Sequence, residues 1–217
     1  MATFTIGDVV ADIRLAVQDT DATIYRYSDT HLTRIVNQAL QRICLMRPDL
    51  FAKISTIALV AGREQSAPVD SVRIIDLLGT SAGASTSEIN QDSLDLMFPL
   101  WEQAAAGTAQ SWMRKVRNPN GFSVYPVSVA GQQLLIEYAQ SPPTYDMVTQ
   151  IALLPNAHFV SVLDACIWLV ESVDNEHVSS GRAKMFQDSF VQGLGLTAQT
   201  KPVTDTYSGG ADPKTVV

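Results

Sequence analysis

The 217-residue sequence predicts an α+β fold, a four-helix bundle made by the N- and C-terminal segments with an inserted antiparallel β-sheet or sandwich. Three observations predict it. Apolar residues recur with helical period near both ends of the chain, short β-branched segments separated by turns fill the middle, and prolines mark both changes of pattern. We expect residues 1–50 and 154–197 to form the bundle, 51–153 an inserted β-rich domain, and 198–217 an extended C-terminal arm.

The two N-terminal helices have clear start and stop signals. Thr5 and Asp8 have the spacing of a capping box, in which each side chain accepts a hydrogen bond from the backbone N–H of the other residue. Ser28 is a favourable N-cap for a second helix, which we expect to run to about Arg47 before Pro48 stops it. The apolar residues of this second helix recur three and four apart: Leu32, Ile35, Val36, Ala39, Leu40, Ile43 and Cys44.

The middle of the chain loses helical period. Strands are expected at 54–60, 64–67, 72–78, 111–116, 122–125 and 133–139. A loop at 80–87 and one or two helical turns at 92–97 interrupt them. Short strands with turns at this spacing are typical of an antiparallel sheet or sandwich.

Helical period returns after Pro155. Asn156 is the expected N-cap of a third helix, whose wide apolar face predicts that it is the most buried of the four. Ser179 or Ser180 begins the fourth helix, and Gly195 is a natural residue to follow its end. The second helix ends at Pro48 and the third begins after Pro155, and both points are expected at one end of the bundle. The β-rich segment between them is therefore expected as an insertion.

Composition indicates an ordinary globular protein made in the cytosol. The 15 basic and 22 acidic residues give a formal charge of −7, so the chain as a whole is not expected to bind nucleic acid by neutralising phosphates. No apolar run reaches the about 20 residues of a membrane-spanning helix, and the N-terminus lacks a signal-peptide pattern. Cys44 and Cys166 lie in helical patterns, as buried thiols in a reducing compartment do.

The sequence predicts neither an enzyme nor a cofactor or metal site. The three histidines have no ligand spacing, and phosphate-binding and nucleophile motifs are missing. Those histidines are His31, His158 and His177. The carboxylates Glu171, Asp174 and Glu176 cluster near the end of the third helix, where a solvated face is favoured over an acid–base pair.

Two other classes of function stay open at this stage. A binding module could hold carbohydrate or peptide on the β insertion through Trp101 and Trp112, provided that both rings are exposed side by side. A hydrolase would need two carboxylates facing each other in a cleft. A basic cluster of Arg114, Lys115 and Arg117 fits contact with an acidic neighbour and protection of an edge strand against aggregation equally well.

A series of weak motifs, taken in order over residues 5–196, carries a resemblance to a known family. The motifs are Asn37–Ile43 with Arg47–Asp49, Thr56–Gln65, Pro68, Arg73–Asp76, Pro99–Trp101, Asn118–Pro119, Phe122, Val124–Pro126, Ile136–Tyr138, Leu153–Pro155, Leu163–Asp164, Arg182–Ala183, Phe190 and Leu194–Gly195. In this order they resemble the tailed-bacteriophage head-to-tail adaptor family, ring proteins beneath the portal that are similar to tail tubular protein A of short-tailed phages.

The resemblance implies a structural virion protein at the head–tail interface, synthesised in the host cytoplasm. It implies a homo-oligomeric ring of twelve copies between the portal protein and a tail nozzle or tail-tube protein, with no membrane contact and no catalytic residues. DNA would pass through the lumen without specific binding. Twelve copies of a chain of charge −7 carry about −84 formal charges, and a wall that repels phosphate lets DNA slide.

Departures from the family pattern lie in the loop 80–87 and in the arm. We expect the arm to be held by another subunit, as an added strand or extended segment. The residues expected to contact the portal, the tail or a neighbouring subunit are Val203, Tyr207, Val216 and Val217 in the arm, Ser81 and Ser85 in the loop, and the basic cluster Arg114, Lys115 and Arg117.

Overall fold

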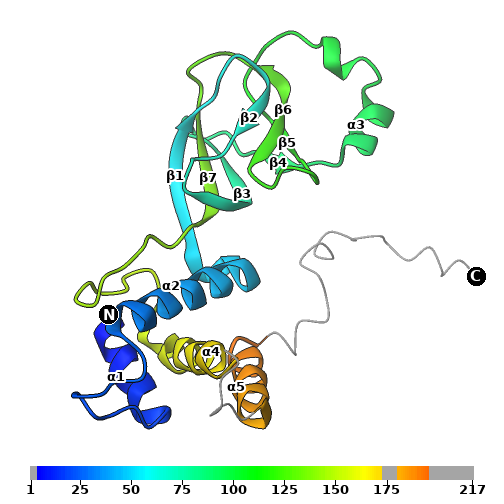
Figure 1. Cartoon of the computed structure of the whole chain (residues 1–217). Coiled ribbons are helices and arrows are strands. Elements are labelled where there is room, and N and C mark those ends of the chain that lie inside the picture. The colour runs from blue at the N-terminus through cyan, green and yellow to red at the C-terminus, as the bar shows by residue number, and fades with distance from the viewer. Residues whose placement is uncertain (1–3, 173–179, 196–217) are drawn as a thin grey trace, which may run out of the picture.

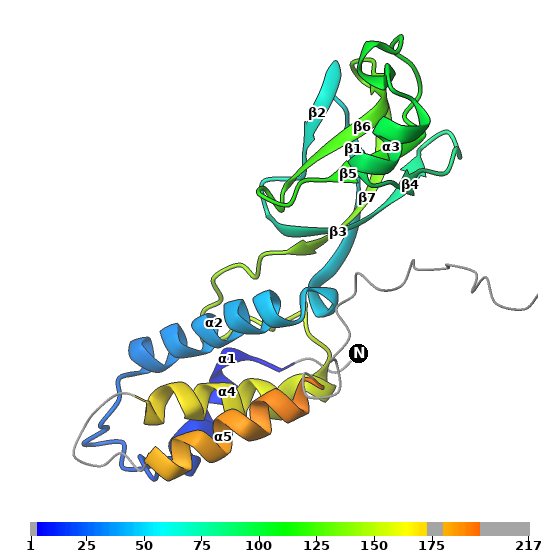
Figure 2. The ribbon, with the colours of Figure 1, turned by 90° about the vertical axis from the view of Figure 1, so that its right-hand side faces the viewer.

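The helices and the strands gather at opposite ends of an elongated molecule in the computed structural model, which describes residues 4–172 and 180–195 (Figures 1 and 2). The helical body contains α1 (Ile6–Ala16), α2 (Asp29–Met46), α4 (Phe159–Glu171) and α5 (Ser180–Gly193). The β body contains β1 (Ala52–Ala58), β2 (Gly62–Ser66), β3 (Ser71–Thr80), β4 (Ser87–Glu88), β5 (Ser111–Arg114), β6 (Gly121–Ser128) and β7 (Gln133–Gln140), with α3 (Gln91–Met97) between β4 and β5. Three 3₁₀ turns lie at Pro48–Phe51 (η1), Trp101–Gln103 (η2) and Asn156–His158 (η3).

The expected start signals of the first two helices are confirmed. Thr5 Oγ1 accepts a hydrogen bond from the Asp8 N–H at 3.1 Å, and Asp8 Oδ2 accepts one from the Thr5 N–H at 2.8 Å. The backbone bond from Thr5, followed by its hydroxyl, lowers the pKa of Asp8. Ser28 Oγ accepts from the His31 N–H at 3.2 Å and begins α2. Asn156 is not the N-cap of α4, because the chain makes the turn η3 first and the helix starts at Phe159.

Two sheets face each other in the β body and share one apolar core. The first has the strand order β1-β7-β3, and the second has the order β2-β6-β5-β4. Tyr138 and Ile136 of β7 meet Trp112 of β5 and Phe122 of β6 in that core, all within 1% of complete burial. The pairing is antiparallel except that β4 runs parallel to β5. A parallel neighbour needs a crossover connection, and the excursion through α3 supplies it.

The predicted four-helix bundle was wrong, although the α+β class fits. The described residues form five α-helices and seven strands in two sheets. α1, α2 and α4 pack on one another and α5 packs along α4, while α1 runs across α4 in both views (Figures 1 and 2). Helical period identifies the apolar face of each helix, but the crossing angle depends on how side chains interlock. The additional helix, α3, matches the one or two helical turns expected at 92–97, but it belongs to the β body and buries only Leu94.

The two bodies meet at a junction where the chain leaves the helices and where it returns. Phe51 of η1 and Ala139 of β7 are buried in the helical core, and Val72 and Ile75 of β3 pack against its edge. The Cys44 thiol of α2 donates to the Gln140 carbonyl at 3.5 Å. The division of the chain into domains with these boundaries stays a prediction.

The returning segment is fastened to α2 by one side chain. Asn37 Oδ1 accepts from the Tyr145 N–H at 2.8 Å, and Asn37 Nδ2 donates to the Tyr145 carbonyl at 3.0 Å and to Thr33 O at 2.9 Å. A side-chain amide can bond both the backbone N–H and the carbonyl of one residue, as a neighbouring strand does in a β-sheet. The segment before α4 is therefore placed against α2 without any regular element of its own.

Buried and half-buried arginines tie the helices to one another. Arg14 of α1 pairs with Asp19 at 2.8 Å and with Asp29 of α2 at 2.6 Å, and it donates to the Tyr27 carbonyl at 2.9 Å. Arg182 of α5 donates to the Ala16 carbonyl at the end of α1. Arg47 donates to the Leu194 carbonyl just after α5.

Removing Asp19 tests this arrangement. Asp19 is 7% exposed, and its carboxylate pairs with Arg14 and accepts the Arg26 and Tyr27 N–H groups at 2.8 and 3.2 Å. Asp19→Ala leaves these donors and a buried cation without their acceptor, so we expect a loss of about 3 kcal/mol in the free energy of unfolding. Urea denaturation measures it. The control Asp188→Ala changes an exposed aspartate of α5 and should shift stability by less than about 0.5 kcal/mol. Equal shifts for both variants would contradict the prediction.

Candidate functional site

The basic cluster predicted from the sequence lies at the end of β5, and two of its members are neutralised within the chain. Arg114 pairs with Glu88 at 3.0 Å and donates to the Ile74 and Ile75 carbonyls of β3 at 2.5 and 3.0 Å. Because β5 and β3 belong to different sheets, this guanidinium links the two sheets.

The other two members of the cluster differ from each other. Lys115 pairs with Glu64 of β2, while Arg117 is exposed and has no ion pair within the described part of the chain. Arg117 is therefore the member of the cluster best placed to meet an acidic neighbour. The contact itself stays a prediction.

Ser81 and Ser85 lie exposed in the loop that follows β3. The backbone closes this loop, since the Thr80 N–H donates to the Ala84 carbonyl at 2.7 Å and the Ser81 N–H donates to Gln133 O at 3.1 Å. Gly79 has a φ of +141°, and a Cβ there would lie 2.5 Å from Ala84 O, so only glycine fits. The loop thus has a defined base, and the contact role of its two serines stays a prediction.

The expected anchors of the C-terminal arm lie outside the described residues. They are Val203, Tyr207, Val216 and Val217. Their role stays a prediction.

The aromatic platform proposed for a binding module does not exist. Trp101 is 4% exposed and Trp112 is 1% exposed, so neither ring presents a face to solvent. Trp112 packs edge-on against Phe122, with ring centroids 6.5 Å apart, and Trp101 packs edge-on against Tyr125 at 6.2 Å. Burial of both rings removes the observation on which the carbohydrate- or peptide-binding alternative depended.

The carboxylate cluster near the end of α4 has a structural member. Glu171 is 6% exposed and pairs with Arg182 of α5 at 3.7 Å, which joins the two helices. Asp174 and Glu176 lie outside the described residues. Within the described ranges 4–172 and 180–195, no group of three or more histidine, cysteine, aspartate or glutamate residues is placed to hold a metal ion.

The two described histidines, His31 and His158, do not converge either. His31 stacks on Tyr27 with ring centroids 5.9 Å apart and contacts Arg34 through Nδ1 at 3.0 Å. His158 ends the turn η3, in a different part of the helical body. His177 lies outside the described residues.

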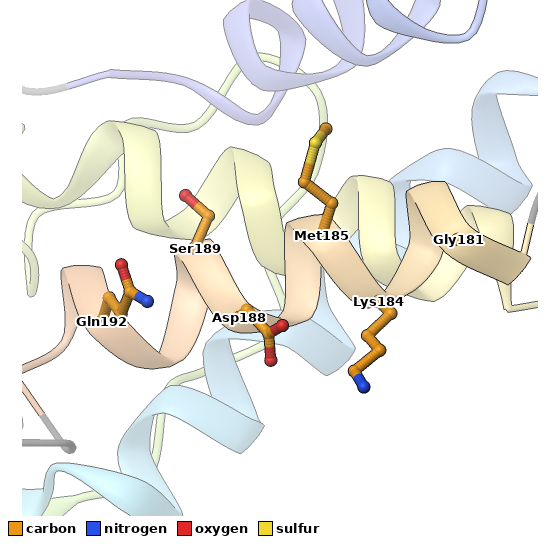
Figure 3. Close-up of a pocket in the computed structure, with 6 residues that line it drawn as sticks. All are labelled: Gly181, Lys184, Met185, Asp188, Ser189 and Gln192. Carbon is orange, nitrogen blue, oxygen red and sulfur yellow. The ribbon is translucent and has the colours of Figure 1, made fainter.

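Two hollows on the described surface, along α5 and along α2, are open grooves rather than enclosed sites. One groove, of about 460 Å³, follows the outer side of α5 and is lined by Gly181, Lys184, Met185, Asp188, Ser189 and Gln192. Figure 3 shows these side chains spread along a single helix and pointing in different directions. Ligand sites are concave and bring a few polar groups together, which this groove does not do.

Comparison with known proteins identifies the class. A family model described as SU10 adaptor protein matches residues 4–213, almost the whole chain. The chain belongs to the SU10 adaptor protein family. Among curated proteins, no match to the chain was found.

Membership in the SU10 adaptor family confirms the expected class of function, a structural adaptor protein of a bacteriophage. The chain is a bacteriophage structural adaptor and a component of the virion. A structural family agrees with the expectation that the protein is no enzyme. Among the helices that the structure describes, none is long and apolar enough to span a bilayer. The finer resemblance to tail tubular protein A stays a prediction.

Sequence reasoning missed one surface of the β body. The side chains around α3, Leu96, Met97, Phe98 and Leu100, are exposed although all four are apolar. In the sequence this surface corresponds to the apolar run 96–101 between Asp95 and Glu102, but an apolar run of this length is equally compatible with a buried turn. The tertiary structure decides between an exposed and a buried run, because Trp101 fills the buried position and leaves the four other apolar side chains exposed.

The two thiols give a direct test of the helical core. Burial raises the pKa of Cys44 to about 11 and raises that of Cys166 further, and Cys166 is completely buried. Because the thiolate is the reactive form, neither cysteine should react with Ellman's reagent in the folded protein at pH 8. Both should react once urea unfolds the chain. Rapid labelling of either thiol without denaturant would show that the core is not closed as described.

Proposed function

We propose that this SU10 adaptor family protein is a subunit of the ring that joins the portal to the tail. The family match across residues 4–213 is the observation that carries the proposal. Twelve copies, each in contact with the portal protein on one side and with a tail nozzle or tail-tube protein on the other, would complete the ring. Likeness to tail tubular protein A belongs to the same proposal.

The separation of helices and strands supports a role between two partners. An adaptor needs two distinct surfaces held at a constant distance, and the helical body and the β body lie at opposite ends of the molecule (Figure 1). The junction around Phe51 and Ala139 joins them through a shared apolar core rather than through a flexible linker. Such a subunit can hold one partner at a fixed position relative to the other.

Charge supports passage of DNA through the ring without binding. The formal charge of −7 is unfavourable for phosphate contacts, and several arginines are already used within the fold. DNA would therefore slide past this wall. In the proposal the arm 198–217 reaches a neighbouring subunit or the portal, and Arg117 with the loop serines supplies further contacts.

The assembly route can be tested with purified components. We expect the isolated protein to be monomeric in light scattering, since copies of charge −7 repel one another and neighbours meet only on a preformed portal. Mixing with the portal of the same phage should give rings, counted by native mass spectrometry. A stable dodecamer of the protein alone would contradict the route, and absence of binding to both portal and tail proteins would contradict the function.

A pair of arm variants tests the proposed anchors. Val203→Asp with Tyr207→Asp places charge on two apolar anchors and should reduce the number of copies bound per portal. Thr204→Asp with Ser208→Asp adds the same charge at polar positions of the same arm and should bind as the wild type does. Equal occupancy for both double variants would exclude the anchors.

A further inference from the structure

The β body carries an exposed apolar lobe at its end remote from the helices. We define the α3 lobe as residues 91–103, which contain α3 and η2 (Figures 1 and 2). Leu96 is 84% exposed, Met97 64%, Phe98 47% and Leu100 70%. Single exposed apolar residues are normal on protein surfaces, but four within five positions form a patch of the kind that marks an interaction site.

The patch does not arise from a loosely attached segment. Leu94 and Trp101 point inward, are 1% and 4% exposed, and pack on Met113 of β5. The indole N–H of Trp101 donates to Asp95 Oδ1 at 2.5 Å, which fixes α3 relative to η2. Since the inward positions are filled, the apolar residues facing outward have no core of their own chain to enter.

The β2 and β6 strands brace the lobe from the side. Arg63 of β2 lies with its guanidinium 5.0 Å from the centre of the Trp101 ring and pairs with Glu102 at 2.5 Å. The Phe98 ring stacks on Tyr125 of β6 with centroids 5.9 Å apart. The patch is therefore presented in a preformed shape, which lowers the entropy cost of binding.

The segment of chain that carries the patch has only acidic charged residues. Residues 81–113 contain Glu88, Asp92, Asp95 and Glu102 and no lysine, arginine or histidine. Glu88 and Glu102 pair with arginines from other strands. Asp92 and Asp95, on α3 itself, have no ion-pair partner within the described residues and border the apolar side chains.

We propose that the α3 lobe docks onto a virion protein other than this chain, at an apolar surface bordered by lysine or arginine side chains. The proposal rests on the adaptor function proposed above and names one of its contact surfaces. Charge complementarity selects the partner, because a basic border meets Asp92 and Asp95. Contact between two lobes would instead bring four unpaired carboxylates together, on chains that each carry −7.

Binding to purified portal and tail proteins of the same phage, measured by biolayer interferometry, tests the lobe. Leu96→Ser with Leu100→Ser should weaken binding to one of these proteins about tenfold or more, because both side chains lose their apolar contact. The matched control is Leu15→Ser with Leu45→Ser, which changes two leucines of the helical body that are 66% and 70% exposed. It should bind that protein as the wild type does.

A charge variant separates the acidic border from the apolar patch. Asp92→Lys should slow association with the same protein and weaken its dependence on salt, while Asp188→Lys, on exposed α5, should not. Thermal melting shows that each variant is folded.

The outcomes distinguish this inference from the function itself. Wild-type binding that the lobe variants leave unchanged would overturn the docking surface and keep the adaptor function. Self-association of the protein that is lost in the lobe variants would overturn the choice of partner. Failure of the wild type to bind either the portal or the tail protein would overturn both proposals.

Discussion

Burial of Phe51 and Ala139 in the helical core is the constraint on which the arrangement of the whole chain depends. The chain enters the β body once, through η1, and returns once, after β7, and both crossings lie at the same end of α2. An apolar joint at the crossing leaves little freedom between the bodies, because separating them would expose these side chains to water. Asn37 then fixes the returning segment along α2.

Arginine side chains connect elements that apolar packing alone would leave adjustable. Arg14 joins α1 to α2, Arg47 and Arg182 cap carbonyl groups that the ends of other helices leave open, and Arg114 links the two sheets. The planar guanidinium with five donors can satisfy several carbonyl and carboxylate oxygens at once.

The family and the structure describe the function at different levels. The SU10 adaptor family accounts for the class of protein, whereas the structure describes the surfaces that such a protein can offer. The hollows along α5 and α2 are open, no group of metal-ligating side chains converges in the described residues, and the distinctive surface features are an exposed apolar lobe and exposed loops. Features of this kind suit assembly, where specificity comes from the shape and charge of extended surfaces.

The sequence by itself determined the helices with caps and apolar period, the order of helical and β-rich segments, and the family. The Thr5–Asp8 capping box and the face of α2 from Leu32 to Cys44 depend on contacts within a few residues, so local pattern is sufficient to predict them. Tertiary structure alone decided which helices cross, that Arg114 reaches into the other sheet, and that Leu96 faces outward while Leu94 and Trp101 face inward. The helix crossings, the contacts of Arg114 and the exposure of Leu96 depend on residues distant in the chain. The periodicity of a local segment carries no information about how such residues pack.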